Sequence, residues 1–328
     1  MPPVKANQVL IKVEASSVNP VDWKFCSGRL DGWMPAEFPM IPGFDCSGTV
    51  VAVGPDCQRL KVGDEVWADL VTRVGTGEMH QGGGVGDGKR HGSMIMGGYG
   101  EYVATEESRV GLKPNNITFD QAGVIPLVAL TALQALEAGQ VGKGQAILIL
   151  GGSGGNGVCA IQMAKAMGAS KIYATCSAAK ADFVTSLGAE VIDYTKQDWA
   201  DVLKGKNIDC IFDTIGPSGD KDCVLKAGTV LKKDGHFCTL LRYNDSLPAG
   251  MSNHFVLTKS DDFKDLDKIK QLCEAQQLSV PIQETFPLEQ VPDAFKVSMG
   301  GRVLGKLCIK VSQVLQHFSS FGSPRFLF

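Results

Sequence analysis

A glycine-rich turn, GGSGGNG at residues 151–157, constrains the fold of this chain more than any other feature. An apolar run, QAILIL, precedes it at residues 145–150, and the apolar segment after it is predicted to form a buried helix. The turn contains G-x-G-x-x-G at Gly152, Gly154 and Gly157. Between a strand and a helix, such glycines allow a tight turn, close approach of a pyrophosphate, and close helix–strand packing. The sequence therefore predicts a dinucleotide site at a helix N-terminus, with a purely structural turn as the alternative.

Bulk properties exclude several classes of protein. The 328 residues suffice for two domains. A formal net charge of −3 provides no basic surface for nucleic acid or acidic lipid, and no apolar run approaches the roughly 20 residues of a membrane span. Ten cysteines without a C-x-x-C pair, and an N-terminus without a signal-peptide apolar region, indicate reduced thiols inside the cell. We expect the cytoplasm, with a chloroplast or mitochondrion as the alternative; a homodimer is compatible with the sequence.

Strands and helices alternate after residue 145, which predicts a parallel sheet with right-handed crossovers. The predicted strands lie at 146–150, 171–175, 191–193, 209–213 and 235–241. The predicted helices lie near 156–167, 179–187, 198–204 and 220–232. The fold class is therefore α/β, with a doubly wound parallel sheet of the Rossmann type.

A second, β-rich domain is predicted around this unit. Residues 8–110 are rich in β-branched runs and turn dipeptides, a helix is predicted over 119–138, and short strands and two amphipathic helices follow residue 254. The expected organisation is a catalytic domain over 1–113 and 254–311, a nucleotide-binding domain over 114–253, and a disordered tail over 312–328.

Residues 74–98 form a glycine-heavy, low-complexity loop. We expect a flexible insertion, because glycine carries a large ordering entropy, or a mobile flap over a site. His80 and His91 lie in this loop, but no cysteine or carboxylate cluster accompanies them to complete a metal site.

Several sequence blocks together resemble the medium-chain dehydrogenase/reductase superfamily, and within it the zinc-independent quinone oxidoreductase and alkenal reductase branch. They lie in family order at residues 17–24 (SVNPVDWK), 38–45, 47–54, 61–67, 98–103, 125–132, 186–194 and 212–216. The block at 17–24 resembles the chloroplast-envelope type of quinone oxidoreductase most closely. The resemblance implies a GroES-like β-barrel beside the Rossmann domain, with the active site between them. The chain departs from the family in its longer 74–98 segment and in lacking an initial β-hairpin.

The resemblance also locates the positions at which zinc alcohol dehydrogenases carry their metal ligands. Asn19, Phe44 and Leu127 occupy them here, and none is a good zinc ligand. Residues 58–158 contain no cysteine for a structural zinc. Without a Lewis acid, hydride transfer to a conjugated acceptor is easier than alcohol oxidation, because conjugation delocalises the developing charge. We therefore expect no metal.

The preference for NADPH is predicted from the segment about 20 residues beyond the glycine turn. An NAD-binding chain usually carries an acid there, but residues 173–177 contain none, and Lys180 follows. A 2′-phosphate favours a cation and hydroxyl donors. By resemblance, Ser177, Lys180 and Tyr194 would surround it. The alternatives are a solvated lysine at a helix start and a surface aromatic.

The remaining candidate residues come from the resemblance. Asn19, Thr131, Asp213 and the backbone at Leu240 and Leu241 would lie near the nicotinamide. The full set predicted to bind the cofactor is Gly152, Ser153, Gly154, Gly155, Asn156, Gly157, Ser177, Lys180, Tyr194, Thr131, Asp213, Leu240 and Leu241.

The catalytic candidates share one loop: Asn19, Asp22 and Lys24. Each has a structural alternative: Asn19 could be an Asn-Pro turn residue, and Asp22 and Lys24 could form a salt bridge. Among the cofactor candidates, Asp213 could instead cap a turn. The proton donor is left open among solvent, a cofactor hydroxyl and Tyr99. We expect an NADPH-dependent reductase of quinones or α,β-unsaturated carbonyl compounds. The alternative is an NADPH-binding regulatory or structural protein with little turnover.

Overall fold

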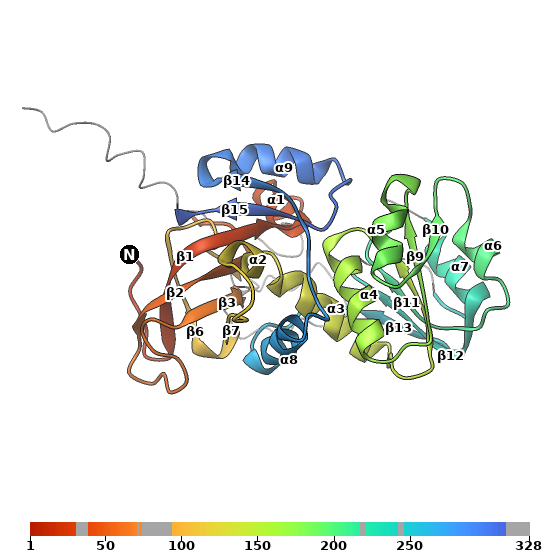
Figure 1. Ribbon diagram of the computed structural model, residues 1–328, viewed down its shortest axis with the longest axis horizontal. Coiled ribbons are helices and arrows are strands. Elements are labelled where there is room, and N and C mark those ends of the chain that lie inside the picture. Colours follow the sequence, from red (N-terminus) through yellow and green to blue (C-terminus); the bar gives the residue numbers. More distant parts are fainter. Residues whose placement is uncertain (31–38, 71, 74–93, 217–220, 242–245, 313–328) are drawn as a thin grey trace, which may run out of the picture.

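The two larger sheets lie side by side in the computed structural model, one at each end of its long axis (Figure 1). The structure describes residues 1–30, 39–70, 72–73, 94–216, 221–241 and 246–312. Most of the predicted flap, residues 74–93, and the predicted tail from residue 313 lie outside these ranges.

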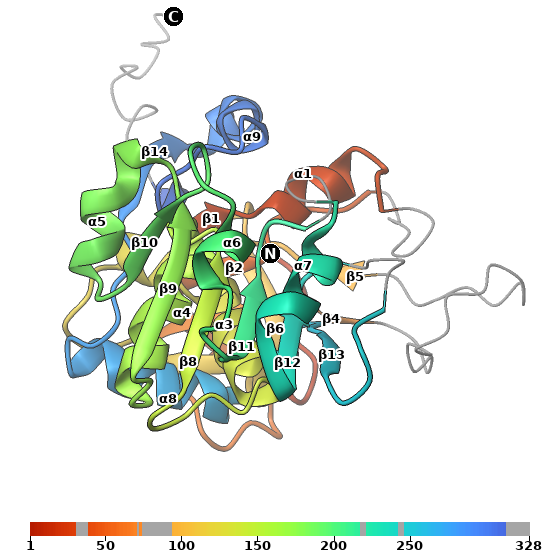
Figure 2. The same cartoon turned by 90° about the vertical axis from the view of Figure 1, so that its right-hand side faces the viewer.

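The nucleotide-binding sheet has six parallel strands in the order β10-β9-β8-β11-β12-β13, as Figure 2 shows from its side of the molecule. The strands are β8 (Ala146–Leu150), β9 (Lys171–Cys176), β10 (Glu190–Asp193), β11 (Ile208–Asp213), β12 (Leu231–Thr239) and β13 (Ser252–Phe255). The chain order reverses between β8 and β11, which is where an open parallel sheet binds its ligand. The predicted α/β fold is confirmed.

Helices cover both faces of this sheet, and the alternation of side chains along β8 explains how. Ile147 and Ile149 belong to the core under α3 (Pro126–Ala138) and α4 (Gly155–Ala166). Leu148 and Leu150 point to the opposite core, under α6 (Trp199–Leu203) and α7 (Cys223–Val230). A strand that is apolar at every position is typical of a parallel sheet buried on both faces.

The second sheet combines the two ends of the chain. Its order is β14-β15-β1-β2-β3-β7, and β6 also pairs with β1. Its strands are β1 (Gln8–Val18), β2 (Asp45–Val53), β3 (Glu65–Asp69), β6 (Tyr102–Glu106), β7 (Val110–Leu112), β14 (Ile282–Pro287) and β15 (Lys306–Lys310). β15 runs antiparallel to β1, with Val18 opposite Leu307. The strands of the parallel sheet thus lie, in the sequence, between the two groups of strands that form this second sheet.

Further helices and turns complete the described chain. The helices are α1 (Pro20–Cys26), α2 (Phe119–Gly123), α5 (Ala181–Ser186), α8 (Phe263–Glu274) and α9 (Val291–Met299). Short 3-10 turns lie at Glu107–Arg109, Ala178–Lys180 and Leu288–Gln290. The last part of the predicted flap is ordered: β5 (Met94–Ile95) pairs with β4 (Thr72–Arg73).

Three boundaries differ from the sequence-based expectation. The helix predicted over 119–138 is two helices, because Pro126 has no N–H to continue the first and starts the second instead. β12 begins at Leu231, within the predicted helix 220–232. Leu231 pairs with Ile208 of β11, and the polar residues that follow Leu231 do not suggest a strand from the sequence. β13 reaches Phe255, so the parallel sheet extends beyond residue 253.

Candidate active site

In the glycine turn between β8 and α4, packing requires two of the three motif glycines but not the third. A Cβ built on Gly152 would lie 2.8 Å from Ala174 Cβ, and one on Gly157 would lie 2.7 Å from Gly152 Cα. Both positions therefore exclude side chains for reasons of packing. A Cβ on Gly154 would meet nothing nearer than the Gly151 carbonyl oxygen at 3.8 Å. Packing does not require a glycine at Gly154, and its open backbone face suits an approaching phosphate.

The start of α4 offers further features that fit a dinucleotide. Gly154 is the residue before the first turn of α4, whose N–H groups have no acceptor within the helix. The next side chain, Asn156, has a buried Oδ1 atom with no hydrogen-bond partner among the described residues. A buried polar atom without a partner is costly, and a cofactor hydroxyl would satisfy it.

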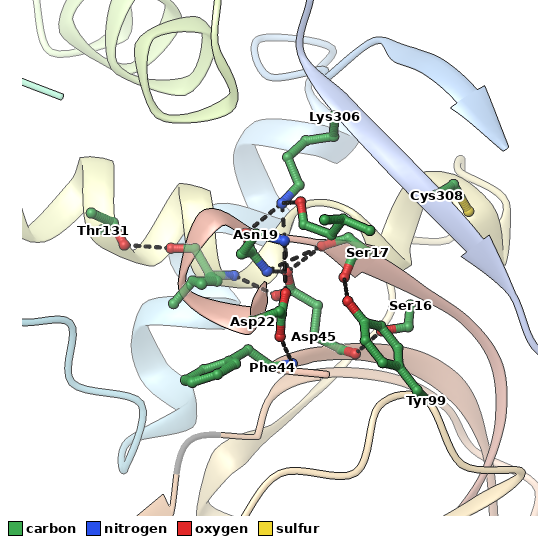
Figure 3. Close-up of polar contacts among 12 residues, drawn as sticks. Ser16, Ser17, Asn19, Asp22, Phe44, Asp45, Tyr99, Thr131, Lys306 and Cys308 are labelled. Carbon is green, nitrogen blue, oxygen red and sulfur yellow. Dashed lines mark hydrogen bonds and ion pairs between the residues drawn. The ribbon is translucent and has the colours of Figure 1, made fainter. Parts of the chain in front are cut away.

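A buried polar cluster lies where β1 ends and α1 begins (Figure 3). Its centre is the carboxylate of Asp45, which is fully buried at the start of β2. One oxygen accepts hydrogen bonds from Ser17 Oγ at 2.6 Å and from Asn19 Nδ2 at 2.8 Å. The other accepts from the backbone N–H of Leu127, at 2.7 Å, in α3. This carboxylate therefore connects the two domains.

Lys306, the first residue of β15, supplies the cation of this cluster. Only 4% of its side chain is exposed, and its Nζ atom lies 3.9 Å from Asp45 Oδ2. It donates to the Val18 carbonyl at 3.0 Å and to Asn19 Oδ1. Burial lowers the pKa of Lys306, and Asp45 and Asp22 oppose that shift.

The stem of Lys306 also reaches the glycine turn. A Cβ at Gly155 would lie 2.8 Å from Lys306 Cδ, so the glycine leaves room for the lysine. The preceding residue, Gly305, donates its N–H to the Ser153 carbonyl at 2.9 Å. Sequence reasoning missed both Lys306 and Asp45. A signal was present in each case: a lysine directly before the apolar residues 307–309, and an aspartate directly after Phe44 in a β-rich run.

The catalytic candidates Asn19 and Asp22 are brought together, but their polar atoms already have partners. The Asn19 side chain donates to Asp45 and accepts from Lys306. The Asp22 carboxylate accepts the backbone N–H groups of Asn19 at 2.7 Å and Phe44 at 3.1 Å. Burial raises the pKa of Asp22 to about 7, against the opposing effects of these hydrogen bonds and of Lys306. Through these two backbone hydrogen bonds Asp22 fixes the β1–α1 corner, and its catalytic role stays a prediction.

Three other candidates have defined contacts. Lys24 is half-buried, with Nζ 5.5 Å from the centre of the Trp23 ring, and burial lowers its pKa. Thr131 Oγ1 donates to the Leu127 carbonyl and lies 2.6 Å from Thr258 Oγ1. The Tyr99 hydroxyl donates to the Ser17 carbonyl at 3.0 Å, and burial followed by Asp22 raises its pKa well above the usual value.

Asp213, Leu240 and Leu241, which are predicted to lie near the nicotinamide, form hydrogen bonds within a turn after β11 and β12. The Asp213 carboxylate accepts from the N–H groups of Ile215 and Gly216 and from Thr239 Oγ1. Leu240 donates its N–H to the Asp213 carbonyl, and Leu241 donates to Thr239 Oγ1. These contacts favour the turn-cap alternative for Asp213, while the backbone of Leu240 and Leu241 stays a prediction as a cofactor contact.

The three residues predicted around a 2′-phosphate lie at one edge of the parallel sheet. Cys176 pairs with Asp193, so Ser177 and Tyr194 are the next residues on neighbouring strands. Lys180 follows after one 3-10 turn. Tyr194 is 58% exposed, which leaves its ring accessible to a ligand.

The positions that hold zinc ligands in relatives carry other chemistry here. Phe44 packs with Phe25 and Met96 in a small apolar cluster that Leu127 also contacts. Asn19 belongs to the polar cluster. Within the described ranges, no three His, Cys, Asp or Glu side chains are grouped closely enough to hold a metal ion.

Comparison with known proteins identifies the family. Residues 5–115 match the alcohol dehydrogenase GroES-like domain, and residues 187–309 match the zinc-binding dehydrogenase family. The 2-methylene-furan-3-one reductase of Solanum lycopersicum is 36% identical over 94% of this chain and 73% of its own length. The chain belongs to the medium-chain dehydrogenase/reductase superfamily. It is an oxidoreductase that uses a nicotinamide cofactor.

Two further relatives agree with this assignment. The NADPH-dependent alkenal/one oxidoreductase of Arabidopsis thaliana, a chloroplastic protein, is 36% identical over 94% of this chain and 73% of its own. The solved quinone oxidoreductase of Coxiella burnetii is 28% identical, with a TM-score of 0.74 over 95% of this chain and 92% of its own. Among the described residues, no helix is both long and apolar enough to cross a membrane.

Proposed function

We propose that this protein transfers hydride from NADPH to α,β-unsaturated carbonyl compounds or quinones, without a metal. The open backbone face of Gly154, which the protein's own packing leaves free, carries the proposal. Support for the substrate class comes from the relatives named for enones and quinones. The residues Asn19, Phe44 and Leu127 support zinc independence, although one matching family is named for zinc binding.

Different residues of the chain would bind different parts of the cofactor. NADPH, when bound, supplies the hydride. The glycine turn and the start of α4 hold its pyrophosphate, and Ser177, Lys180 and Tyr194 hold its 2′-phosphate. Lys306 lies against the turn and also fixes Asn19, so it orients the end of β1 relative to the pyrophosphate.

The chemistry at the acceptor needs little from the protein. Hydride addition to the β-carbon of an enone moves an electron pair onto the carbonyl oxygen, and the resulting enolate takes a proton from solvent at its α-carbon. The apolar cluster of Phe25, Phe44 and Met96 lies beside Asp22, and its three side chains are buried, so it supports the site from below and exposes almost no surface to an acceptor. The Tyr99 hydroxyl already donates its proton to the Ser17 carbonyl, which favours solvent over Tyr99 as the proton donor.

NADPH oxidation by the purified protein, followed at 340 nm across quinones, alkenals and cyclic enones, tests this proposal. We expect turnover with at least one of these classes and none with simple alcohols plus NADP⁺. Tight NADPH binding without turnover on any acceptor would favour the regulatory alternative.

The cofactor preference is tested separately. We expect NADPH to bind at least about tenfold tighter than NADH, a difference of about 1.4 kcal/mol. Lys180→Ala should remove most of this preference. The control is Lys196→Ala, because Lys196 lies at the same sheet edge but pairs with Asp193. Equal dissociation constants for both cofactors in the unmodified protein would contradict the assignment.

For location, we propose the cytoplasm. Relatives named chloroplastic and mitochondrial make an organelle the alternative. Fractionation of cells expressing the tagged chain distinguishes the two. For assembly, we propose a homodimer; sedimentation of the purified chain at micromolar concentration would show a monomer if this is wrong.

A further inference from the structure

Two histidines face each other at one edge of the nucleotide-binding sheet, on strands that do not contribute to the buried polar cluster. His236 lies in β12 and His254 in β13, the last strand of the sheet order (Figure 2). Nδ1 of His236 lies 3.0 Å from Nε2 of His254. The ring centres are 5.2 Å apart, and the ring planes are tilted by 31°. One nitrogen of each ring is therefore close to its partner on the other strand.

The strand pairing holds both rings in place. β12 and β13 run parallel, with His236 opposite Ser252 and Cys238 opposite His254. Paired residues share a face of the sheet, as do residues two apart on one strand, so both histidines lie on the face that carries Cys238. Both are only partly buried, and the second nitrogen of each ring has no hydrogen-bond partner among the described residues. Solvent and small ions can therefore reach the pair.

The separation of the two facing nitrogens matches one metal ion bound to both. Imidazole nitrogens lie about 2.0–2.1 Å from a bound first-row divalent ion. Two such nitrogens are about 2.8–3.0 Å apart when the bonds meet at a right angle, and about 3.3–3.4 Å apart at the tetrahedral angle. The separation of 3.0 Å fits the right angle. Square-planar or tetragonal coordination is typical of Cu²⁺ and Ni²⁺, whereas Zn²⁺ is usually tetrahedral.

We propose that His236 and His254 form a binding site for a divalent copper or nickel ion, with water supplying the remaining ligands. Neutral imidazole is a good ligand for both ions. In the free protein, the hydrogen bond requires a proton on one of the two facing nitrogens. On metal binding this proton moves to the outer nitrogen of the same ring, so the ring stays neutral and both facing lone pairs are available to the ion.

The site is open and separate from hydride transfer. Among the described residues, no third His, Cys, Asp or Glu side chain joins the pair, so mild chelation should remove the ion. The inference does not rest on the proposed function, because neither histidine belongs to the residues expected to bind NADPH or the acceptor. An ion held by both rings would join β13 to β12 and would stabilise the folded chain, since the unfolded chain does not hold the two histidines together.

Calorimetric titration of the tag-free chain with Ni²⁺ at neutral pH tests the site. We expect one ion per chain, released by EDTA, and weaker binding of Zn²⁺ than of Ni²⁺. His236→Gln and His254→Gln should each raise the Kd of Ni²⁺ by at least about tenfold. The matched control is His80→Gln, the same substitution at a histidine outside the pair, and it should leave the Kd unchanged.

Electron paramagnetic resonance with Cu²⁺ tests the unmodified chain directly, so the proposal can be decided even if a variant is unstable. One equivalent of Cu²⁺ should give a tetragonal signal with hyperfine coupling to two nitrogen ligands. Each of three results would overturn the site: no saturable binding of Ni²⁺ by the unmodified chain, the same Kd in His254→Gln as in the unmodified chain, or a copper signal without nitrogen ligands. Loss of the ion in His80→Gln would also overturn it, because the ion would then lie elsewhere.

Discussion

Substituting Gly154 with alanine should separate cofactor binding from folding. Gly154 has φ −82° and ψ 170°, an extended conformation that any residue adopts. Its added Cβ would lie 3.8 Å from the Gly151 oxygen, an ordinary contact. We therefore expect the free energy of unfolding to stay within about 1 kcal/mol, with a small gain from the stiffer unfolded chain.

The same methyl group would stand where the pyrophosphate approaches the backbone. Hydrogen bonds to a charged group contribute about 1.5–3 kcal/mol each. Displacing the phosphate by enough to lose one or two of them would weaken NADPH binding by about 3 kcal/mol, or more than a hundredfold.

Gly157→Ala is the informative comparison. Its Cβ would lie 2.7 Å from Gly152 Cα and closer still to the Gly151 oxygen, so backbone must move. We expect it to cost about 1–3 kcal/mol of stability or more. Urea unfolding and calorimetric titration of both variants measure the two effects. Binding of NADPH to Gly154→Ala within threefold of the unmodified protein would refute the placement of the phosphates.

Three further outcomes follow from the site. Because the pKa of Asp22 rises to about 7 in the folded state, its protonated form stabilises the fold at low pH. This contribution to the free energy of unfolding, about 4 kcal/mol, should be lost as the pH rises from 4 to 7. Urea unfolding across this range should show the loss in the unmodified protein and not in Asp22→Asn. Lys306→Met should lower the free energy of unfolding by about 3–5 kcal/mol, because it leaves Asp45 buried without its cation. Lys310→Met breaks a partly exposed pair on the same strand and should lower it by under about 1 kcal/mol. Equal losses of stability in denaturant would contradict the role of Lys306. Elemental analysis should find no stoichiometric zinc, and about one zinc per chain that resists mild chelation would overturn the metal-free mechanism.

Local patterns predicted the glycine turn and the alternating strands, because each depends on neighbouring residues. The motif assigned one role to each glycine; the space around them shows a packing restriction at Gly152 and Gly157 and open space at Gly154. The polar cluster could not be predicted in the same way. Asn19, Asp45 and Lys306 are far apart in the sequence, and only the pairing of β15 with β1 brings the lysine to the other two. Asn19 and Asp22 were identified as candidates, but their partners depend on that topology.

The pairing of Val18 with Leu307 also sets the order in which the chain can fold. During synthesis β1 leaves the ribosome first, yet its neighbour β15 leaves almost 300 residues later. The nucleotide-binding domain is complete before that, and domains generally fold as they emerge. Asp45 must therefore remain without its ammonium partner until the final strand arrives. Until β15 is added, the sheet therefore lacks both the strand that pairs with residues 15–18 of β1 and the cation beside Asp45.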